Sequence, residues 1–241
     1  MWLFINTLAA PKNCYHWATR LQPWIASAGL LLFALGLISG LILAPADYQQ
    51  GDAYRILFIH VPAAVLSLGV YVFMSVAVMI FLIWKIKIAD MVAKVSAPLG
   101  AIFTLITLVT GALWGKPTWG TFWIWDARLT SELILLFIYL GIMALRSAIP
   151  VETLSARATS LLVMVGLVNI PIVHYSVTWW HTLHQGPTVL QFSRPTIASS
   201  MLYPLLLMFV AYILLFIWLM LLNLRAEILA REQGARWRVL L

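Results

Sequence analysis

Residues 56–84 read Ile56-LFIHVPAAVLSLGVYVFMSVAVMIFLI-Trp84 and contain no Asp, Glu, Lys or Arg. This run of 29 uncharged residues is longer than the roughly 20 apolar residues that an α-helix needs to cross a bilayer. Five further uncharged runs cover residues 21–46, 95–115, 133–145, 158–193 and 195–224. The pattern predicts an all-α, polytopic integral membrane protein.

The composition of the chain favours the same class. Of its 241 residues, 63% are hydrophobic and only 10% are charged, whereas a soluble domain has about 25% charged residues. Continuous apolar runs argue against a membrane β-barrel, because its strands alternate apolar and polar residues. The single cysteine, Cys14, excludes a disulfide framework, and the sequence contains no CxxCH motif for covalent haem attachment.

Six membrane-spanning helices are expected from the uncharged runs. The run 133–145 is short, so its helix is expected to begin near Leu129. The run 158–193 is long, but its second half contains Gly186 and Pro187 and many polar residues, so we expect one helix followed by a loop. The expected spans are residues 24–43, 57–84, 95–113, 129–145, 158–174 and 202–222, in a single membrane domain over residues 1–241.

The Lys and Arg residues indicate how these spans are oriented. Eleven of the 15 fall on the side that holds both termini, and the four on the other side are Arg55, Lys116, Arg128 and Arg194. Because cytoplasmic loops are enriched in Lys and Arg, both termini are expected to be cytoplasmic. The net charge of +7 then reports membrane orientation and does not indicate binding to nucleic acid.

One face of the third expected span carries only small side chains. They are Ser96, Gly100, Thr104, Thr107 and Gly111. Small residues on one face of a membrane helix allow a neighbouring helix to approach closely. This face is therefore expected to pack against other spans.

Tryptophan is concentrated in the two expected outer loops, residues 114–128 and 175–200, which hold six of the twelve Trp. An aromatic belt at the membrane interface accounts for single Trp residues. It accounts less well for four within twelve residues, namely Trp114, Trp119, Trp123 and Trp125. A flat aromatic surface with Lys116 and Arg128 at its edges suits a planar aromatic ligand that carries carboxylates, such as a porphyrin.

The spacing within the first outer loop adds two expectations. Trp119 and Trp123 are four residues apart, so a helical loop would place them on one face. Gly115 and Gly120 would let a flat ligand or another backbone come close, because glycine has no side chain.

Four of the five histidines are expected at or near the outer interface: His60, His174, His181 and His184. An ionisable residue in this position is a candidate functional residue. Haem held by two histidines needs one imidazole on each porphyrin face, and His181 and His184 would point the same way on a helix. The expected pair is therefore His60 with one of the other three. Zinc is the competing metal, but it needs three or four clustered ligands and leaves the Trp-rich loop unexplained.

Three segments resemble the CcmC family, the haem exporter proteins C of bacterial cytochrome c biogenesis, within the larger group of haem-handling proteins with a WWD motif. The resemblance extends over essentially the whole chain. The segments are Trp119-GTFWIWDARL-Thr130, Tyr54-RILFIHV-Pro62 and His181-TLH-Gln185.

This resemblance implies a haem-handling scaffold of the bacterial inner membrane and not an enzyme acting alone. It implies that non-covalent haem b is held at the periplasmic face and presented to the haem chaperone CcmE, which binds it covalently. CcmA and CcmB, an ABC-type pair, and the small membrane protein CcmD would complete the complex. Any ATP-driven step is expected in a partner, because this chain has no P-loop.

The resemblance also assigns residues by their matching motifs. It implies that His60 and His184 are the axial ligands of the haem iron and that residues 114–126 form the haem platform. Arg55, Lys116 or Arg128 are candidate propionate partners on the basis of charge and position. The expected haem contacts besides the two histidines are Arg55, Trp114, Trp119, Gly120, Trp123, Trp125, Asp126 and Arg128.

Two other functions remain open at this point. A b-type membrane cytochrome in quinone-linked electron transfer usually places its histidines deeper in the membrane than expected here. A haem permease subunit predicts polar groups near the bilayer midplane, where Asn169 is the nearest candidate.

Overall fold

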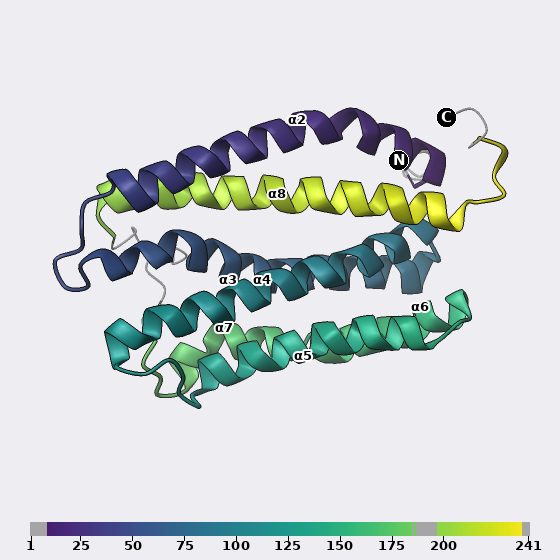
Figure 1. The fold of residues 1–241 in the computed structure, drawn as a ribbon. Helices are drawn as coiled ribbons and strands as arrows, with labels where there is room; N and C mark the ends of the chain where they lie inside the picture. Colours follow the sequence, from purple (N-terminus) through teal and green to yellow (C-terminus); the bar gives the residue numbers. More distant parts are fainter. Residues whose placement is uncertain (1–8, 185, 187–196, 238–241) are drawn as a thin grey trace.

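The structure is a computed structural model that describes residues 9–184, 186 and 197–237. Within these residues it contains helices and no strand. The helices run lengthwise in one bundle (Figure 1). In chain order they are α2 (Pro11–Leu37), a π-helical turn η1 (Ile38–Leu43), a 3-10 turn η2 (Asp52–Ile56), α3 (Leu57–Trp84), α4 (Lys87–Trp119), α5 (Ala127–Ala148), α6 (Glu152–Gly166), α7 (Asn169–Trp179) and α8 (Ser199–Arg231).

Six helical segments are long and apolar enough to cross a membrane, which confirms the predicted all-α, six-span class. They extend beyond the uncharged runs because a helix continues through polar residues until the backbone turns. Lys85, with a left-handed φ of 56°, separates α3 from α4, and Gly120, with a φ of 82°, ends α4. The six segments are Pro11–Leu43, Asp52–Trp84, Lys87–Trp119, Ala127–Ala148, Glu152–Trp179 and Ser199–Arg231.

The fifth of these segments is interrupted where α6 meets α7. Proline has no N–H, so Pro171 cannot donate to the carbonyl of Leu167, four residues earlier. The chain forms a turn at Leu167 and Val168, and Ile170 donates to Leu167 instead. The helix then continues to Trp179, five residues past the expected end of this span.

The helices form three groups in the bundle (Figure 1). α2 packs along α8, α3 and α4 occupy the middle, and α5, α6 and α7 lie on the opposite side. The start of α2 and the segment after α8 meet at one end, where the rings of Tyr15 and Trp237 are 5.7 Å apart. The even number of spans thus places both described ends of the chain on the same side.

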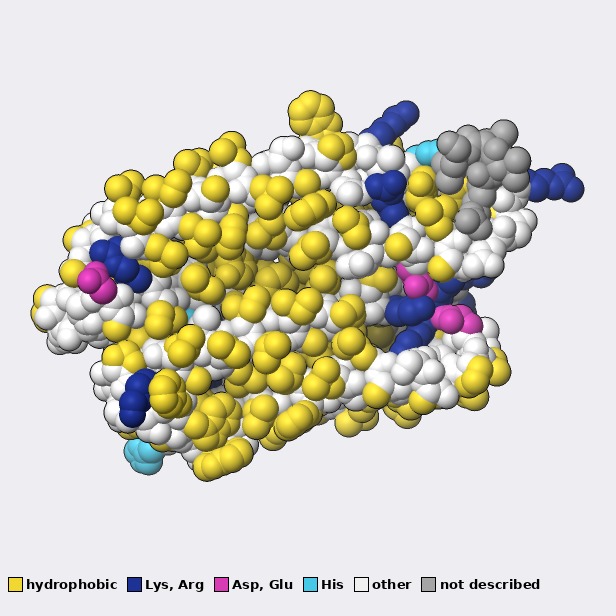
Figure 2. All heavy atoms as spheres, in the orientation of Figure 1, with side chains coloured by type: hydrophobic (Ala, Val, Ile, Leu, Met, Phe, Trp, Pro, Cys, Tyr) yellow, Lys and Arg dark blue, Asp and Glu magenta, His cyan; other side chains and the backbone are white. Residues whose placement is uncertain are grey.

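Hydrophobic side chains cover the middle of the bundle, and charged side chains gather toward its two ends (Figure 2). Lipid is an apolar solvent, so large exposed side chains such as Leu31, Phe137 and Leu161 are favourable in this band. This surface fits a multi-pass membrane protein.

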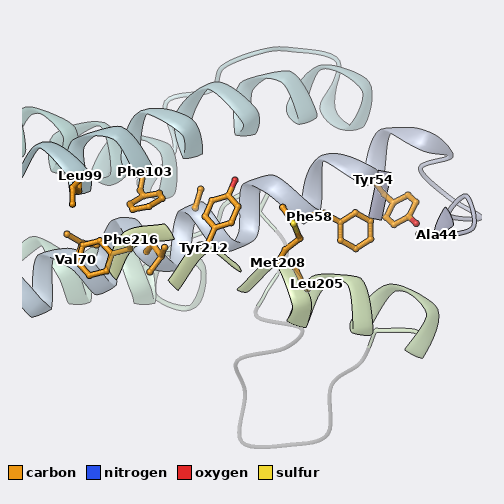
Figure 3. Close-up of a cluster of buried hydrophobic side chains, with 12 residues drawn as sticks. Ala44, Tyr54, Phe58, Val70, Leu99, Phe103, Leu205, Met208, Tyr212 and Phe216 are labelled. Carbon is orange, nitrogen blue, oxygen red and sulfur yellow. The ribbon is translucent and has the colours of Figure 1, made fainter. Parts of the chain in front are cut away.

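A buried cluster between α3, α4 and α8 holds the N-terminal end of α3 in place (Figure 3). Phe58 is fully buried, and a side chain at Gly40 would lie 2.7 Å from its ring, so η1 and α3 touch closely here. Tyr54 donates a 2.6 Å hydrogen bond to the carbonyl of Pro45. These contacts fix the first turns of α3, from which His60 projects.

The small-residue face of α4 packs inside the bundle, as expected. Ser96 and Thr104 are fully buried. Gly100 lies against Tyr139 of α5, whose hydroxyl donates to the carbonyl of Ser67 at 2.9 Å. The rings of Tyr139 and Tyr71 are 5.2 Å apart, and together they fill the centre of the bundle.

We expect Gly100→Ala to lower the free energy of unfolding by about 1–3 kcal/mol, as overpacking does in cores. A Cβ at this position would lie 2.2 Å from Cζ of Tyr139, which is buried and hydrogen bonded. Thermal unfolding in detergent measures the change. Gly69→Ala in α3 is the matched control, because a Cβ there meets nothing within 4 Å. Equal melting temperatures for the two variants would contradict this packing.

Candidate functional site

The first Trp-rich segment is divided between the end of α4 and a short turn. α4 continues as far as Trp119, so Trp114 and Trp119 belong to the helix. Gly120 then adopts a left-handed conformation, and Lys116 donates to its carbonyl at 3.0 Å. The expectation that Trp119 and Trp123 share one helical face is wrong, because the helix ends between them.

Asp126 terminates this turn and begins α5. Its Oδ1 accepts a 2.8 Å hydrogen bond from the backbone N–H of Leu129, which caps the helix. Its Oδ2 is buried and makes no hydrogen bond, and it lies 3.8 Å from Nδ1 of His184. One carboxylate thus anchors the helix and faces a histidine from the segment after α7.

Each of two histidines has its own Trp neighbour. The ring of Trp114 is 5.8 Å from that of His60, and its Nε1 donates to Oε1 of Gln50 at 2.8 Å. The ring of Trp119 is 4.9 Å from that of His184. The two remaining Trp of the turn pair with each other.

Trp123 and Trp125 have ring centroids 5.4 Å apart. Trp125 is 78% exposed, whereas Nε1 of Trp123 is buried and has no hydrogen-bond partner. An indole N–H normally finds an acceptor when it is buried, so Trp123 retains a free donor at the edge of the site. Trp125 presents its surface outward.

His60 and His184 line one small pocket that is open to solvent. His60 comes from α3 and His184 from the segment after α7, so the two imidazoles approach from separate elements. His174 and His181 are exposed and do not line this pocket. Of the alternatives left open by the sequence, His184 is the one that the described structure brings to His60. The pocket is completed by Thr107, Leu108, Gly111, Ala112, Arg128, Leu129 and Glu132.

His60 is oriented by a polar contact, and His184 is kept neutral by its surroundings. Nδ1 of His60 is 3.0 Å from Oγ1 of Thr110 on α4. Burial, and then the charge of Arg128, lower the pKa of His184 to about 4. His184 is therefore neutral at pH 7, and a neutral imidazole has a lone pair available for a metal.

Among the candidate cations, Arg128 lines the pocket and Arg55 does not. One guanidinium nitrogen of Arg128 donates to the carbonyl of Val173 at 2.7 Å, which ties α5 to α7. Arg55 pairs with Asp52 at 2.9 Å and donates to the carbonyl of Gly40 at 3.2 Å. Arg55 thus connects η2 to η1 and stabilises the turn between α2 and α3.

Two polar residues of this site were not predicted from the sequence: Glu132, which lines the pocket, and Thr110, which contacts His60. Glu132 is buried and accepts a 2.7 Å hydrogen bond from Ser67. A carboxylate within an apolar span was the available signal. Thr110 precedes Trp114 by one helical turn, but hydroxyls on membrane helices commonly bond their own backbone, so its contact with His60 had no distinct signature.

The residues present fit haem better than zinc. In the parts of the chain that the structure describes, no group of three or more His, Cys, Asp or Glu could hold a metal ion. Haem iron needs two protein ligands at most, because the porphyrin supplies the other four. Two imidazoles that line one pocket, Trp rings beside each, and buried polar atoms without partners at Trp123, Asp126 and His184 suit such a ligand.

Comparisons with known proteins agree with this chemistry. A family model described as heme exporter protein C (CcmC) matches residues 4–239. Proteins named heme exporter protein C from Haemophilus influenzae and Escherichia coli K12 are 46% and 48% identical over 237 residues, which is 98% of this chain and 96% of each relative. A putative cytochrome c biosynthesis ccmC-like mitochondrial protein from Marchantia polymorpha is 47% identical over 184 residues, 76% of this chain and 78% of that protein.

Proposed function

The chain belongs to the heme exporter protein C family, and on that premise we propose that it is a haem-handling scaffold of cytochrome c biogenesis. It binds non-covalent haem b at the periplasmic face of the bacterial inner membrane, between His60 and His184. It presents this haem to the chaperone CcmE for covalent attachment. It works beside the ABC-type subunits CcmA and CcmB and the small protein CcmD.

One observation carries this proposal: His60 and His184 line a single pocket from two separate elements. Opposed imidazoles are what a six-coordinate porphyrin iron requires. His184 is neutral at pH 7 because its pKa is lowered to about 4, so it needs no deprotonation before binding. When bound, haem would supply the iron centre and a vinyl group at the edge of the porphyrin.

The chain's own residues supply position and shape. The rings of Trp114 and Trp119 flank the two histidines and cover a flat apolar ligand. Arg128 is the cation on the pocket wall and is the proposed propionate partner. Trp125, which is 78% exposed, lies where a soluble chaperone can reach it. Proximity of haem and chaperone, and not a catalytic group of this chain, promotes the attachment.

The structure offers the permease alternative little support. Asn169 is buried and donates to the carbonyl of Ser131 at 3.0 Å, so it joins α7 to α5. Tyr71 and Tyr139 are fully buried and fill the centre of the bundle below the pocket. The polar groups in this region therefore stabilise helix packing.

The test is to purify the full-length protein in detergent from cells that make haem and to record its visible spectrum. A low-spin, b-type spectrum is expected, and added CcmE should take up the haem covalently. Protein that never carries haem, even when produced with CcmE, would overturn the proposal. Haem that is retained but exchanges electrons rapidly with quinone would favour the cytochrome alternative.

Haem retention should also depend on the Trp neighbours of the histidines. We expect Trp119→Ala to weaken haem binding about 3- to 10-fold, which corresponds to the 0.5–1.5 kcal/mol of an aromatic contact. Competition with a haem-binding apoprotein measures the change. Trp24→Ala is the control, because Trp24 is 77% exposed on α2, away from the pocket. Equal retention in both variants would assign Trp119 to the interfacial belt.

A further inference from the structure

The side chains that face Nδ1 of the two pocket histidines are chemically different. Nδ1 of His60 faces the hydroxyl of Thr110 at 3.0 Å, and Nδ1 of His184 faces a carboxylate oxygen of Asp126 at 3.8 Å. In metal sites, the group that accepts from the second ring nitrogen fixes the tautomer and sets the basicity of the ligand. The difference between the two partners therefore bears on how strongly each histidine binds.

The Thr110 hydroxyl must act as an acceptor toward His60. A hydroxyl has one hydrogen, and that of Thr110 is committed to the carbonyl of Ile106 at 2.6 Å. The hydrogen between Thr110 and His60 consequently belongs to Nδ1 of His60. This tautomer leaves the lone pair on Nε2. The acceptor is neutral and is held rigidly by α4.

The Asp126 carboxylate offers His184 a charged acceptor. Oδ1 is held by the N–H of Leu129, so the carboxylate is fixed at the start of α5. Oδ2 of Asp126 and Nδ1 of His184 are both buried, and neither has a hydrogen-bond partner. A shift of about 1 Å in the segment that carries His184 would bring them to the usual N–H···O distance. An unpaired buried polar atom is costly, so this shift is favourable when Nε2 binds a ligand.

Other surroundings of the two rings are similar. Each ring has an edge-to-face Trp neighbour, Trp114 for His60 and Trp119 for His184. The aromatic contacts therefore do not distinguish the ligands. The neutral hydroxyl and the carboxylate do, because a hydrogen bond to an ionised acceptor is roughly twice as strong as one to a neutral acceptor.

We propose that Asp126 makes His184 the stronger axial ligand of the haem iron, and that His60, whose Nδ1 faces the neutral hydroxyl of Thr110, is the ligand that exchanges. The inference rests on the proposed haem-binding function and deepens it. Asp126 and Thr110 are positioning residues that act through the histidines. A protein that must release its haem to a chaperone needs one iron ligand that dissociates before the other.

The test uses full-length glycine variants of each histidine, purified without haem and then supplied with haem together with an added imidazole. In His184→Gly the space left by the ring lies beside Asp126, and in His60→Gly it lies beside Thr110. Imidazole can fill either space and donate its N–H, whereas 1-methylimidazole has no N–H to donate. Imidazole and 1-methylimidazole are each titrated into both variants, and the low-spin spectrum reports binding. The ratio of the two affinities gives the preference for imidazole at each position.

We expect imidazole to bind about 10- to 100-fold more tightly than 1-methylimidazole in His184→Gly, the range by which outer partners change metal-site affinity. A several-fold smaller preference is expected in His60→Gly. Adding Asp126→Asn should remove most of the preference in His184→Gly. Asn is as good a helix cap as Asp, so this change removes the charge and keeps the start of α5.

Two further variants check Thr110. In the parent background, Thr110→Val should speed the replacement of a histidine by added imidazole, and Thr110→Ser should restore the parent rate. Thr104→Val is the matched control, since the Thr104 hydroxyl makes the same bond to its own helix, at 2.8 Å to Gly100, and touches no histidine.

The outcomes separate this inference from the function on which it rests. A parent protein without a bis-histidine spectrum would overturn both. A parent protein with that spectrum, but with equal imidazole preferences in the two glycine variants, would overturn the inference alone. So would an Asp126→Asn variant that leaves the preference in His184→Gly unchanged. In the parent background, Asp126→Asn should also raise the midpoint potential of the haem, because losing the carboxylate weakens electron donation by His184.

Discussion

Protein that carries His60→Ala or His184→Ala is expected to purify without the absorption bands of haem. Each variant removes one of the two imidazoles that line the pocket. Losing a direct iron ligand should weaken binding by more than about 100-fold, the upper end of the loss caused by changing a ligand's outer partner. The haem-to-protein ratio, from the visible spectrum and a pyridine haemochrome assay, measures the effect.

The chain provides matched controls for this result. His174 and His181 lie within ten residues of His184 in the sequence but are exposed and do not line the pocket. His174→Ala and His181→Ala should therefore keep the parent haem content. Thermal unfolding of all four variants separates loss of haem from loss of the fold. Full haem content in His184→Ala, or its loss in His181→Ala, would show that the pocket has been assigned the wrong ligand.

The membrane class and the six spans could be predicted because their signal is local. A bilayer-length run without charge identifies a helix wherever its neighbours lie, and the structure has six such segments. The helix ends were less predictable. α4 runs through Lys116 and Pro117 to Trp119, because nothing before Gly120 turns the backbone.

The arrangement of the site was only partly accessible from the sequence. Motif resemblance pointed to His60 and His184, but residue spacing alone left three partners for His60. What distinguishes His184 is tertiary: Arg128 and α7 place the segment after Trp179 beside the start of α5. The contacts of Thr110 and Asp126 with the two rings join residues 50 or more positions apart, and no local pattern encodes them.

The other end of the bundle is held by a buried ion network that the sequence analysis counted only as loop charge. Asp90 of α4 is 4% exposed and accepts from both terminal nitrogens of Arg146 at 2.7 Å. It also accepts from Arg231 of α8 at 2.6 Å. Arg146 reaches Glu152 at the start of α6 as well. One carboxylate thus connects α4, α5 and α8.

We expect Asp90→Ala to lower the free energy of unfolding by about 3–5 kcal/mol, the cost of breaking a buried ion pair from one side. The side chain of Arg146 is only 9% exposed, so it loses its main partner where little solvent reaches it. Thermal unfolding in detergent measures this. Asp52→Ala is the control: Asp52 also pairs with an arginine but is 78% exposed, and an exposed pair contributes about 1 kcal/mol or less.

The same variant separates stability from haem binding. Asp90 lies at the opposite end of α4 from the pocket, so folded Asp90→Ala protein should keep the parent spectrum and the parent haem content. Unchanged stability would mean that Glu152 and Glu227, which also contact Arg231 at 2.8 and 2.5 Å, compensate for the lost carboxylate. The double variant Asp90→Ala, Glu152→Ala should then show the decrease in the free energy of unfolding. A stable double variant would contradict a structural role for the network.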